Sequence, residues 1–292
     1  MQCEFCGCQS TDKRRCPQCG NLLVYNVSGT RPPAALTRPS AGTTTPAAAD
    51  HGIDWRALAI GGVLGSLLAA WGGFLFSIIG MLSVLIHETG HALAAWLVGR
   101  PAIPKFDLQY GGGITPISCR NDLICALLAI AALWLLWHAW QRGPRWVAVT
   151  VIAVAIPPIL IVSGWDALWF TAAGHAAEAI MAAVFLVRAA TGIGIAHRLE
   201  AGLSALIGTG LWWQVSGFAS SLIHDASFQD RYADGKGGVL NNDLTVLADL
   251  AGGTVVGWAW ALLIFSIIAL FAAAAVTWGI VRYRHQQASA AS

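Results

Sequence analysis

Five long stretches without a charged side chain limit what this chain can fold into more than any other feature. No Asp, Glu, Lys or Arg lies between Arg56 and Glu88, and none lies between Asp249 and Arg282. The other three charge-free stretches are residues 123–141, 146–165 and 201–224. Each is close to or longer than the ~20 apolar residues that a membrane-spanning helix needs. One long core helix of a soluble protein could mimic one stretch, but five predict a polytopic membrane protein.

The composition excludes the main soluble alternatives. Charged residues make up 11% of the chain and hydrophobic residues 56%, whereas a soluble globular chain carries roughly 25% charged residues. Too few charges are present to cover a water-facing surface, and disordered chains are poor in apolar residues. The net charge of +2 argues against a nucleic-acid partner.

The lengths of the apolar segments predict the number of helices. Residues 57–99 would extend about 65 Å as a helix, twice the ~30 Å hydrocarbon core, so they should form two helices that turn near residues 71–73 or at Gly80. The expected fold class is therefore an all-α polytopic membrane protein with about six to eight transmembrane helices. The further spans are expected at residues 123–141, 146–164, 166–188, 199–222 and 255–281.

Basic residues near the segment ends indicate the orientation. Arg142 and Arg145, and likewise Arg282 and Arg284, favour the cytoplasm by the positive-inside rule, as do Lys and Arg residues near the N-terminus. The first twenty residues hold five Cys and no apolar signal-peptide core. We expect a bacterial plasma-membrane protein with a cytoplasmic N-terminus. Two cytoplasmic ends require an even number of crossings, so one of seven candidate spans should be re-entrant or wrong.

Two Cys-x-x-Cys-Gly knuckles open the chain. Cys3 and Cys6 form the first and Cys16 and Cys19 the second, while Cys8 is a spare or could replace Cys6. Two knuckles supply the four thiolates that a structural zinc ion prefers, and the metal stabilises a segment too short for a core. A disulfide pair is disfavoured in a reducing cytosol, and no thioredoxin-like unit follows that would suggest a redox site. The pattern predicts a zinc ribbon.

The chain divides into four predicted parts. Residues 1–24 form the ribbon, which we expect to bind a cytosolic protein partner. Residues 25–54 are rich in Pro, Thr and Ala and are predicted to be a flexible linker. Residues 55–284 form the membrane domain, and residues 285–292 a C-terminal tail.

The motif His87-Glu88-Thr89-Gly90-His91 lies inside an apolar helix. On a helix the two histidines share one face and can hold one Zn²⁺, while Glu88 can take a proton from the bound water, whose pKa zinc lowers to about 7. Burying these groups in a membrane is costly, so they should have a partner. A structural polar cluster and a proton relay are the alternatives.

The surrounding residues carry a family resemblance. Residues 80–99, with His-Glu-Thr-Gly-His-Ala-Leu-Ala-Ala at positions 87–95, resemble the active-site helix of the site-2-protease family of intramembrane zinc metalloproteases. Residues 105–116 are similar to the β-like segment that follows the motif in that family, where a substrate can pair by strand addition. The resemblance covers about 40 of 292 residues. It implies a substrate-binding role for Gly111, Gly112 and Gly113.

The third zinc ligand is the least determined feature. In the resembled family it is an Asp in an Asp-Gly motif, which is absent here as such, and the closest string holds Asp243 and Asp249. His175 and Glu178 share a helix face inside a span, and a later Glu completes the ligand set of thermolysin-type enzymes. We expect Glu178 first, Asp243 or Asp249 second and Asp166 third. His175 is expected as a fourth ligand or a positioning group, and a self-contained polar pair is the alternative.

These patterns predict an integral-membrane zinc metalloprotease that cleaves membrane-associated proteins. Two alternatives are a catalytically inactive protease-like scaffold and a metal or proton transporter. The Gly-rich string around Lys236 lacks the Ser or Thr and the preceding strand of a phosphate loop, so no nucleotide is expected.

Overall fold

The computed structural model of the chain describes residues 53–107, 112–234 and 242–291. All described residues belong to one compact unit. The predicted ribbon with Cys3, Cys6, Cys16 and Cys19 lies outside the described residues, as does almost all of the predicted linker.

The elements are α1 (Trp55–Trp71), α2 (Phe74–Leu97), β1 (Lys105–Asp107), β2 (Gly112–Ile114), α3 (Asp122–Arg142), α4 (Pro144–Ser163), α5 (Asp166–Thr191), α6 (Arg198–His224), α7 (Ala226–Ala233), α8 (Asp243–Ala251) and α9 (Val255–Ala291).

The described residues form an all-α membrane protein with one small sheet. Five of the helices, α2, α3, α4, α5 and α9, are long and apolar enough to cross a bilayer. The helix α1 is apolar but has 17 residues. The helix α6, at the position of a predicted span, has 27 residues but lower hydropathy than the five. The coarse fold-class prediction is confirmed.

The first two helices meet at a glycine turn. The helix α1 ends at Trp71 and α2 begins at Phe74. Gly72 and Gly73 between them have φ angles of 66° and 85°, which residues with a Cβ rarely adopt. Gly80 lies inside α2. The structure therefore confirms the predicted turn at residues 71–73.

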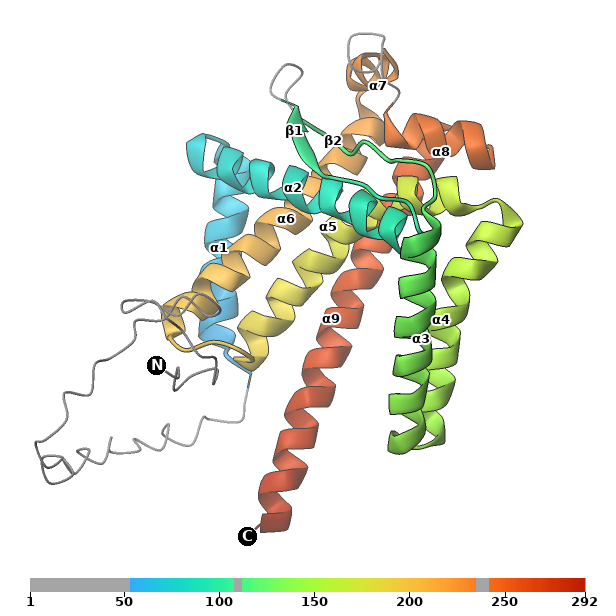
Figure 1. Cartoon of the computed structure of the whole chain (residues 1–292). Coiled ribbons are helices and arrows are strands. Elements are labelled where there is room, and N and C mark those ends of the chain that lie inside the picture. The colour runs from blue at the N-terminus through green and yellow to red at the C-terminus, as the bar shows by residue number, and fades with distance from the viewer. Residues whose placement is uncertain (1–52, 108–111, 235–241, 292) are drawn as a thin grey trace, which may run out of the picture. The chain divides into compact units, whose positions relative to one another are not determined.

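Both described ends of the chain lie at the C-terminal end of α5. The backbone N–H of Asp54, just before α1, donates to the carbonyl oxygen of Ala190 at 3.0 Å. The Arg284 side chain, near the end of α9, donates to the carbonyl oxygen of Thr191 at 2.7 Å. The start of α6 lies at this same end (Figure 1). We call it the basic end. The helix α9 continues to Ala291, through most of the segment 285–292 that was predicted as a C-terminal tail.

The opposite end of α5 gathers the polar elements, and we call it the hairpin end. Asp166, at the start of α5, pairs with Arg100 after α2 at 3.1 Å and with Arg120 before α3 at 3.6 Å. A buried cluster joins the end of α6 to α8 and to the start of α9. The strands β1 and β2 and the short helices α7 and α8 lie at this end (Figure 1).

The helices take different paths between the two ends. The helices α1 and α2 together carry the chain once from the basic end to the hairpin end, with α2 lying across the other helices (Figure 1). The helices α3 and α4 leave the hairpin end and return to it, and α5, α6 and α9 each connect the two ends.

Candidate functional site

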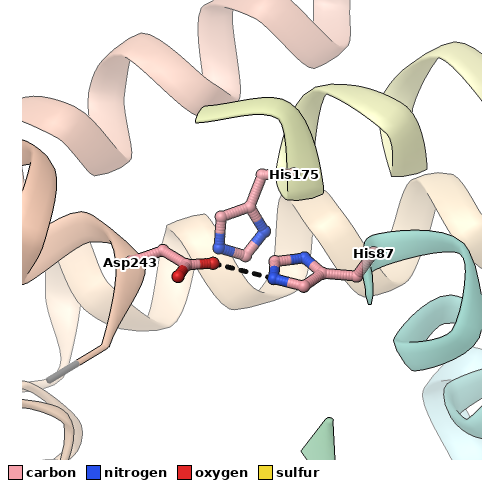
Figure 2. A group of neighbouring side chains, drawn as sticks. All are labelled: His87, His175 and Asp243. Atoms are coloured by element: carbon pink, nitrogen blue, oxygen red, sulfur yellow. Dashed lines mark hydrogen bonds and ion pairs between the residues drawn. The ribbon is translucent and has the colours of Figure 1, made fainter. Parts of the chain in front are cut away.

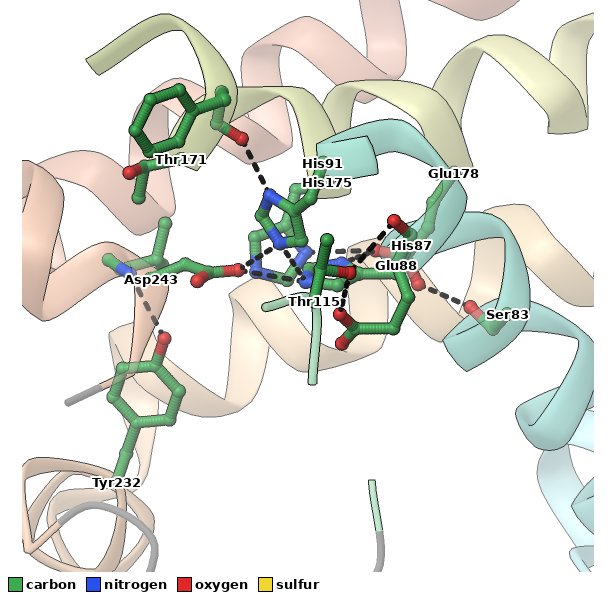
Figure 3. Close-up of polar contacts among 12 residues, drawn as sticks. Ser83, His87, Glu88, His91, Thr115, Thr171, His175, Glu178, Tyr232 and Asp243 are labelled. Carbon is green, nitrogen blue, oxygen red and sulfur yellow. Dashed lines mark hydrogen bonds and ion pairs between the residues drawn. The ribbon is translucent and has the colours of Figure 1, made fainter. Parts of the chain in front are cut away.

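Two histidines of α2 form the centre of the site. His87 and His91 lie one helical turn apart, and their Nε2 atoms are 3.0 Å from each other. The two imidazole rings meet edge to face (Figure 3). In the structure, His87 and His91 therefore share one face of α2, as their spacing predicted.

Asp243, the first residue of α8, completes a triangle with these nitrogens. Its Oδ2 atom lies 2.8 Å from His87 Nε2 and 3.0 Å from His91 Nε2. Figure 2 shows the carboxylate facing the imidazole of His87. Burial acts to raise the pKa of Asp243, but its hydrogen bonds with the two histidines outweigh burial and hold that pKa well below its usual range. Asp243 is therefore an ionised group that faces both imidazoles.

Glu178 of α5 meets the opposite side of His87. Its Oε2 atom lies 3.1 Å from His87 Nδ1 and 2.9 Å from His175 Nδ1. The hydroxyl of Ser83 donates to its other oxygen. The Nε2 atoms of His87 and His91 converge with the Asp243 carboxylate, whereas Glu178 contacts the Nδ1 atom on the other side of the His87 ring. The Glu178 carboxylate therefore lies outside the point where these atoms converge. The sequence ranked Glu178 above Asp243 as third ligand, and this geometry reverses the order.

The other carboxylates considered as ligands lie elsewhere. Asp166 forms the ion pairs with Arg100 and Arg120 described above. Asp249 is exposed near the end of α8. Neither contributes to the histidine cluster.

The hydrogen-bond partners of the Nδ1 atoms, the outer nitrogens of His87 and His91, indicate which ring nitrogens carry a hydrogen. His91 Nδ1 lies 2.6 Å from the carbonyl oxygen of Phe170, so this nitrogen must carry the hydrogen. His87 Nδ1 faces the carboxylate of Glu178 and donates to it in the same way. When both imidazoles are neutral, they present Nε2 lone pairs toward Asp243, and when they are protonated, they donate to it instead. The three atoms can therefore converge on a shared proton or on a metal cation.

The donor set fits zinc. Two imidazoles and a carboxylate are the three protein ligands of many catalytic zinc sites, and the outer nitrogen of a ligating histidine usually donates to a carboxylate or a carbonyl. Both outer contacts are present here, from Glu178 and from Phe170.

His175 lies beside this centre. Its ring centroid is 4.4 Å from that of His87, and its other face stacks on Phe218. One ligand atom from each of His87, His175 and Asp243 lies within 4.8 Å of the other two (Figure 2). Because Glu178 accepts from His175 Nδ1, the remaining nitrogen of His175 is free to act as a further ligand.

Gly174 makes room for the two histidines. A Cβ at this position of α5 would lie 2.5 Å from His91 Nε2 and 2.7 Å from His87 Nε2. Any larger residue would displace the donor atoms. The sequence offers no signal for this requirement, because Gly174 resembles other small residues of an Ala-rich helix.

Glu88 faces the small sheet. The hydroxyl of Thr115, which follows β2, donates to its carboxylate at 2.6 Å (Figure 3). The strands β1 and β2 are antiparallel, with Phe106 opposite Gly113. A Cβ on Gly113 would collide with the Glu88 side chain, so this position needs glycine. The structure confirms an extended segment at Gly112 and Gly113, while Gly111 lies outside the described residues. Thr115 was not singled out from the sequence.

A cavity of about 430 Å³ surrounds these groups. The side chains of His87, Glu88, His91 and Asp243 all line it. Its other polar lining residues are Ser83, Thr115, Thr171, His175, Glu178, Gln214, Tyr232 and Asn242. The candidate catalytic and ligand residues therefore share one space.

Tyr232 of α7 forms hydrogen bonds with the two residues that flank Asp243 in the chain. Its hydroxyl accepts a hydrogen bond from the backbone N–H of Leu244 at 3.1 Å, and its carbonyl oxygen accepts one from the Asn242 side chain at 2.6 Å. Burial, with a smaller contribution from nearby Asp243, raises the pKa of the Tyr232 hydroxyl, which keeps its proton. Tyr232 thereby positions the start of α8.

Comparison with known proteins gave no match to a family model, a curated protein or a solved structure.

Proposed function

We propose that this protein is an integral-membrane zinc metalloprotease that hydrolyses peptide bonds of membrane-associated proteins. The observation that carries the proposal is the convergence of His87 Nε2, His91 Nε2 and Asp243 Oδ2 within 3.0 Å of one another. The hydrogen bonds at the outer histidine nitrogens support it, as does Glu88 in the same cavity. The resemblance of residues 80–99 to the site-2-protease active-site helix agrees with it.

The ligand assignment follows from distance. His87, His91 and Asp243 would hold the zinc, and Glu178 would orient His87 by accepting its Nδ1 proton. His175 would be a fourth ligand or would approach the substrate. When bound, zinc would act as a Lewis acid that polarises the scissile carbonyl and lowers the pKa of water.

Glu88 would perform the proton transfers. It takes a proton from the attacking water, whose oxygen forms a bond to the carbonyl carbon. It then delivers that proton to the amine as the C–N bond breaks, so the acid and amine products balance. Thr115 holds one Glu88 oxygen by its hydroxyl and thereby restrains the rotation of the carboxylate.

Zinc content tests the site. Purified full-length wild type should contain two zinc ions per chain, one in the ribbon and one in the membrane domain. The His87→Ala/His91→Ala double variant should contain one. A wild type with one zinc ion and a variant that loses none would contradict the membrane site.

The variant Glu88→Gln separates a protease from a binding scaffold or a transporter. It keeps the shape of the side chain and removes the base, so zinc content should stay at the wild-type level. Cleavage of membrane proteins in reconstituted vesicles should fall by at least about 100-fold, the usual range for a general base. Unchanged cleavage by this variant would contradict the assigned role of Glu88.

A further inference from the structure

Gln214 of α6 differs from every other polar side chain that lines the cavity. The hydroxyl, imidazole, amide and carboxylate groups of the other lining residues each have a hydrogen-bond partner. Within the described part of the chain, the Gln214 amide has none. The Gln214 side chain is half-buried, so its amide is available to a molecule that enters the cavity. The unpaired amide therefore marks a place for a ligand.

We call the part of the cavity that is lined by Gln214, Gly80, Val84 and Val215 its inner arm. Gly80 and Val84 of α2 line this part, on the N-terminal side of His87, and Val215 lines it from α6. A Cβ on Gly80 would lie 3.4 Å from the Gln214 Nε2 atom, which shows how closely the amide approaches α2. Gly113 and Thr115 line the cavity near Glu88 instead. The arm runs along a helix that is apolar enough to cross a membrane.

A substrate backbone would need the groups that Gln214 offers. A segment unwound from a helix in apolar surroundings exposes N–H and C=O groups, and each costs several kcal/mol when unsatisfied. A glutamine amide carries both a donor and an acceptor, so it can pair with both groups of one peptide unit. Side chains next to that unit would meet Gly80, Val84 and Val215, which are small or apolar.

We infer that Gln214 binds the main chain of an unwound apolar substrate segment on one side of the scissile bond. This inference rests on the proposed protease function. It assigns to the inner arm a preference for apolar segments of any sequence, because the amide reads the peptide backbone and not a side chain. A Gln214→Leu variant would keep the volume and lose both hydrogen bonds.

Three hydroxamates test this inference by calorimetry on zinc-loaded, detergent-solubilised full-length protein. Acetohydroxamate reaches only the metal. The hydroxamate of N-acetyl-trileucine extends on the acyl side, and a succinyl hydroxamate of Leu-Leu amide extends on the amine side. Gln214→Leu should weaken one of the two peptidyl probes about tenfold, as expected for one or two hydrogen bonds. The affinity for acetohydroxamate should not change.

Thr209→Val is the matched control, because it removes a polar group from α6 at a residue that does not line the cavity. It should bind all three probes like wild type. Equal affinity of both peptidyl probes for wild type and Gln214→Leu would overturn the inference, as would an equal loss for all three probes. If acetohydroxamate does not bind the wild type, the proposed zinc site itself fails.

Discussion

At the scale of single residues, the site depends on which carboxylate faces which imidazole nitrogen. Asp243 faces the two inner Nε2 atoms, whereas Glu178 faces the outer Nδ1 of His87. Both carboxylates hydrogen-bond to the same histidine, so contact alone does not identify the ligand. The distinction lies in the nitrogen that each one meets, because Glu178 accepts from Nδ1–H of His87, whereas Asp243 faces the Nε2 atoms of both histidines.

The two carboxylates should differ in how much they contribute to zinc affinity. Asp243→Asn should lower the affinity more than about 100-fold, because it replaces a charged ligand. Glu178→Gln should lower it about 10- to 100-fold, the range typical of groups that orient a ligand. Competition with graded concentrations of a chelator measures both values. A larger loss for Glu178→Gln would restore Glu178 as the ligand.

Gly174→Ala should disrupt the zinc site through one methyl group. The new Cβ would lie 2.5 Å from His91 Nε2, so the histidine must move and the zinc affinity should fall by at least about tenfold. Gly202→Ala is the control, since a Cβ there meets nothing within 4 Å. Circular dichroism should show equal helix content in both variants. Full zinc binding by Gly174→Ala would show that the space left by Gly174 beside the two histidines is not needed.

At the scale of elements, the site is assembled from three helices that the chain does not connect directly. The helix α2 provides His87 and His91, α5 provides Glu178 and Gly174, and α8 provides Asp243. The helix α8 has only nine residues, and its packing against α6 and α9 holds Asp243 in place. We expect the affinity for zinc to depend on the packing of α8.

Tyr232→Phe tests this dependence without touching the ligands. The change removes the hydroxyl that accepts from Leu244 N–H, so the start of α8 loses one hydrogen bond. Zinc affinity should fall about two- to tenfold, the effect of one modest hydrogen bond. Tyr283→Phe in α9 is the control, because Tyr283 is exposed. Equal zinc affinities of the two variants, measured by competition with a chelator, would show that Tyr232 does not position α8.

At the scale of the whole membrane unit, its two ends differ in charge. Seven arginines lie at the basic end or in the α3–α4 turn away from the hairpin end: Arg56, Arg142, Arg145, Arg188, Arg198, Arg282 and Arg284. Among the described residues, the acidic side chains at that end are Asp54 and Glu200. The hairpin end holds eight described acidic residues: Asp107, Asp122, Asp166, Asp225, Asp230, Asp234, Asp243 and Asp249. Its described basic residues are Arg100, Lys105, Arg120 and Arg231.

This asymmetry predicts that the basic end faces the cytoplasm and the hairpin end the opposite side. Cys119, an exposed thiol just before α3, reports on the hairpin end. A membrane-impermeant maleimide should label it in intact cells, and Cys119→Ser should abolish that labelling. Labelling that appears only after the cells are opened would reverse the orientation.

Local sequence patterns were sufficient for much of the fold. The charge-free stretches predicted the membrane helices, and glycines predicted the turn at residues 71–73. The spacing of His87 and His91 predicted their shared face, because helical periodicity is a property of neighbouring residues. The Gly-rich segment at 112–113 was expected to be extended, and it forms β2.

The third ligand could not be obtained in this way. Asp243 lies 156 positions after His87, and no periodicity relates residues on separate helices. Glu178 was the stronger expectation because a carboxylate inside a span needs a partner, and it does have one, at the other nitrogen of His87. Thr115, Gly174 and Gln214 acquire their roles only through packing.

The amino-acid sequence by itself thus determined a polytopic membrane protein that carries a histidine pair and a glutamate on one helix. The tertiary structure alone decided which groups face that pair. The physical reason is that helix formation and hydropathy depend on residues close along the chain, whereas a ligand set depends on side chains that packing brings together from distant segments.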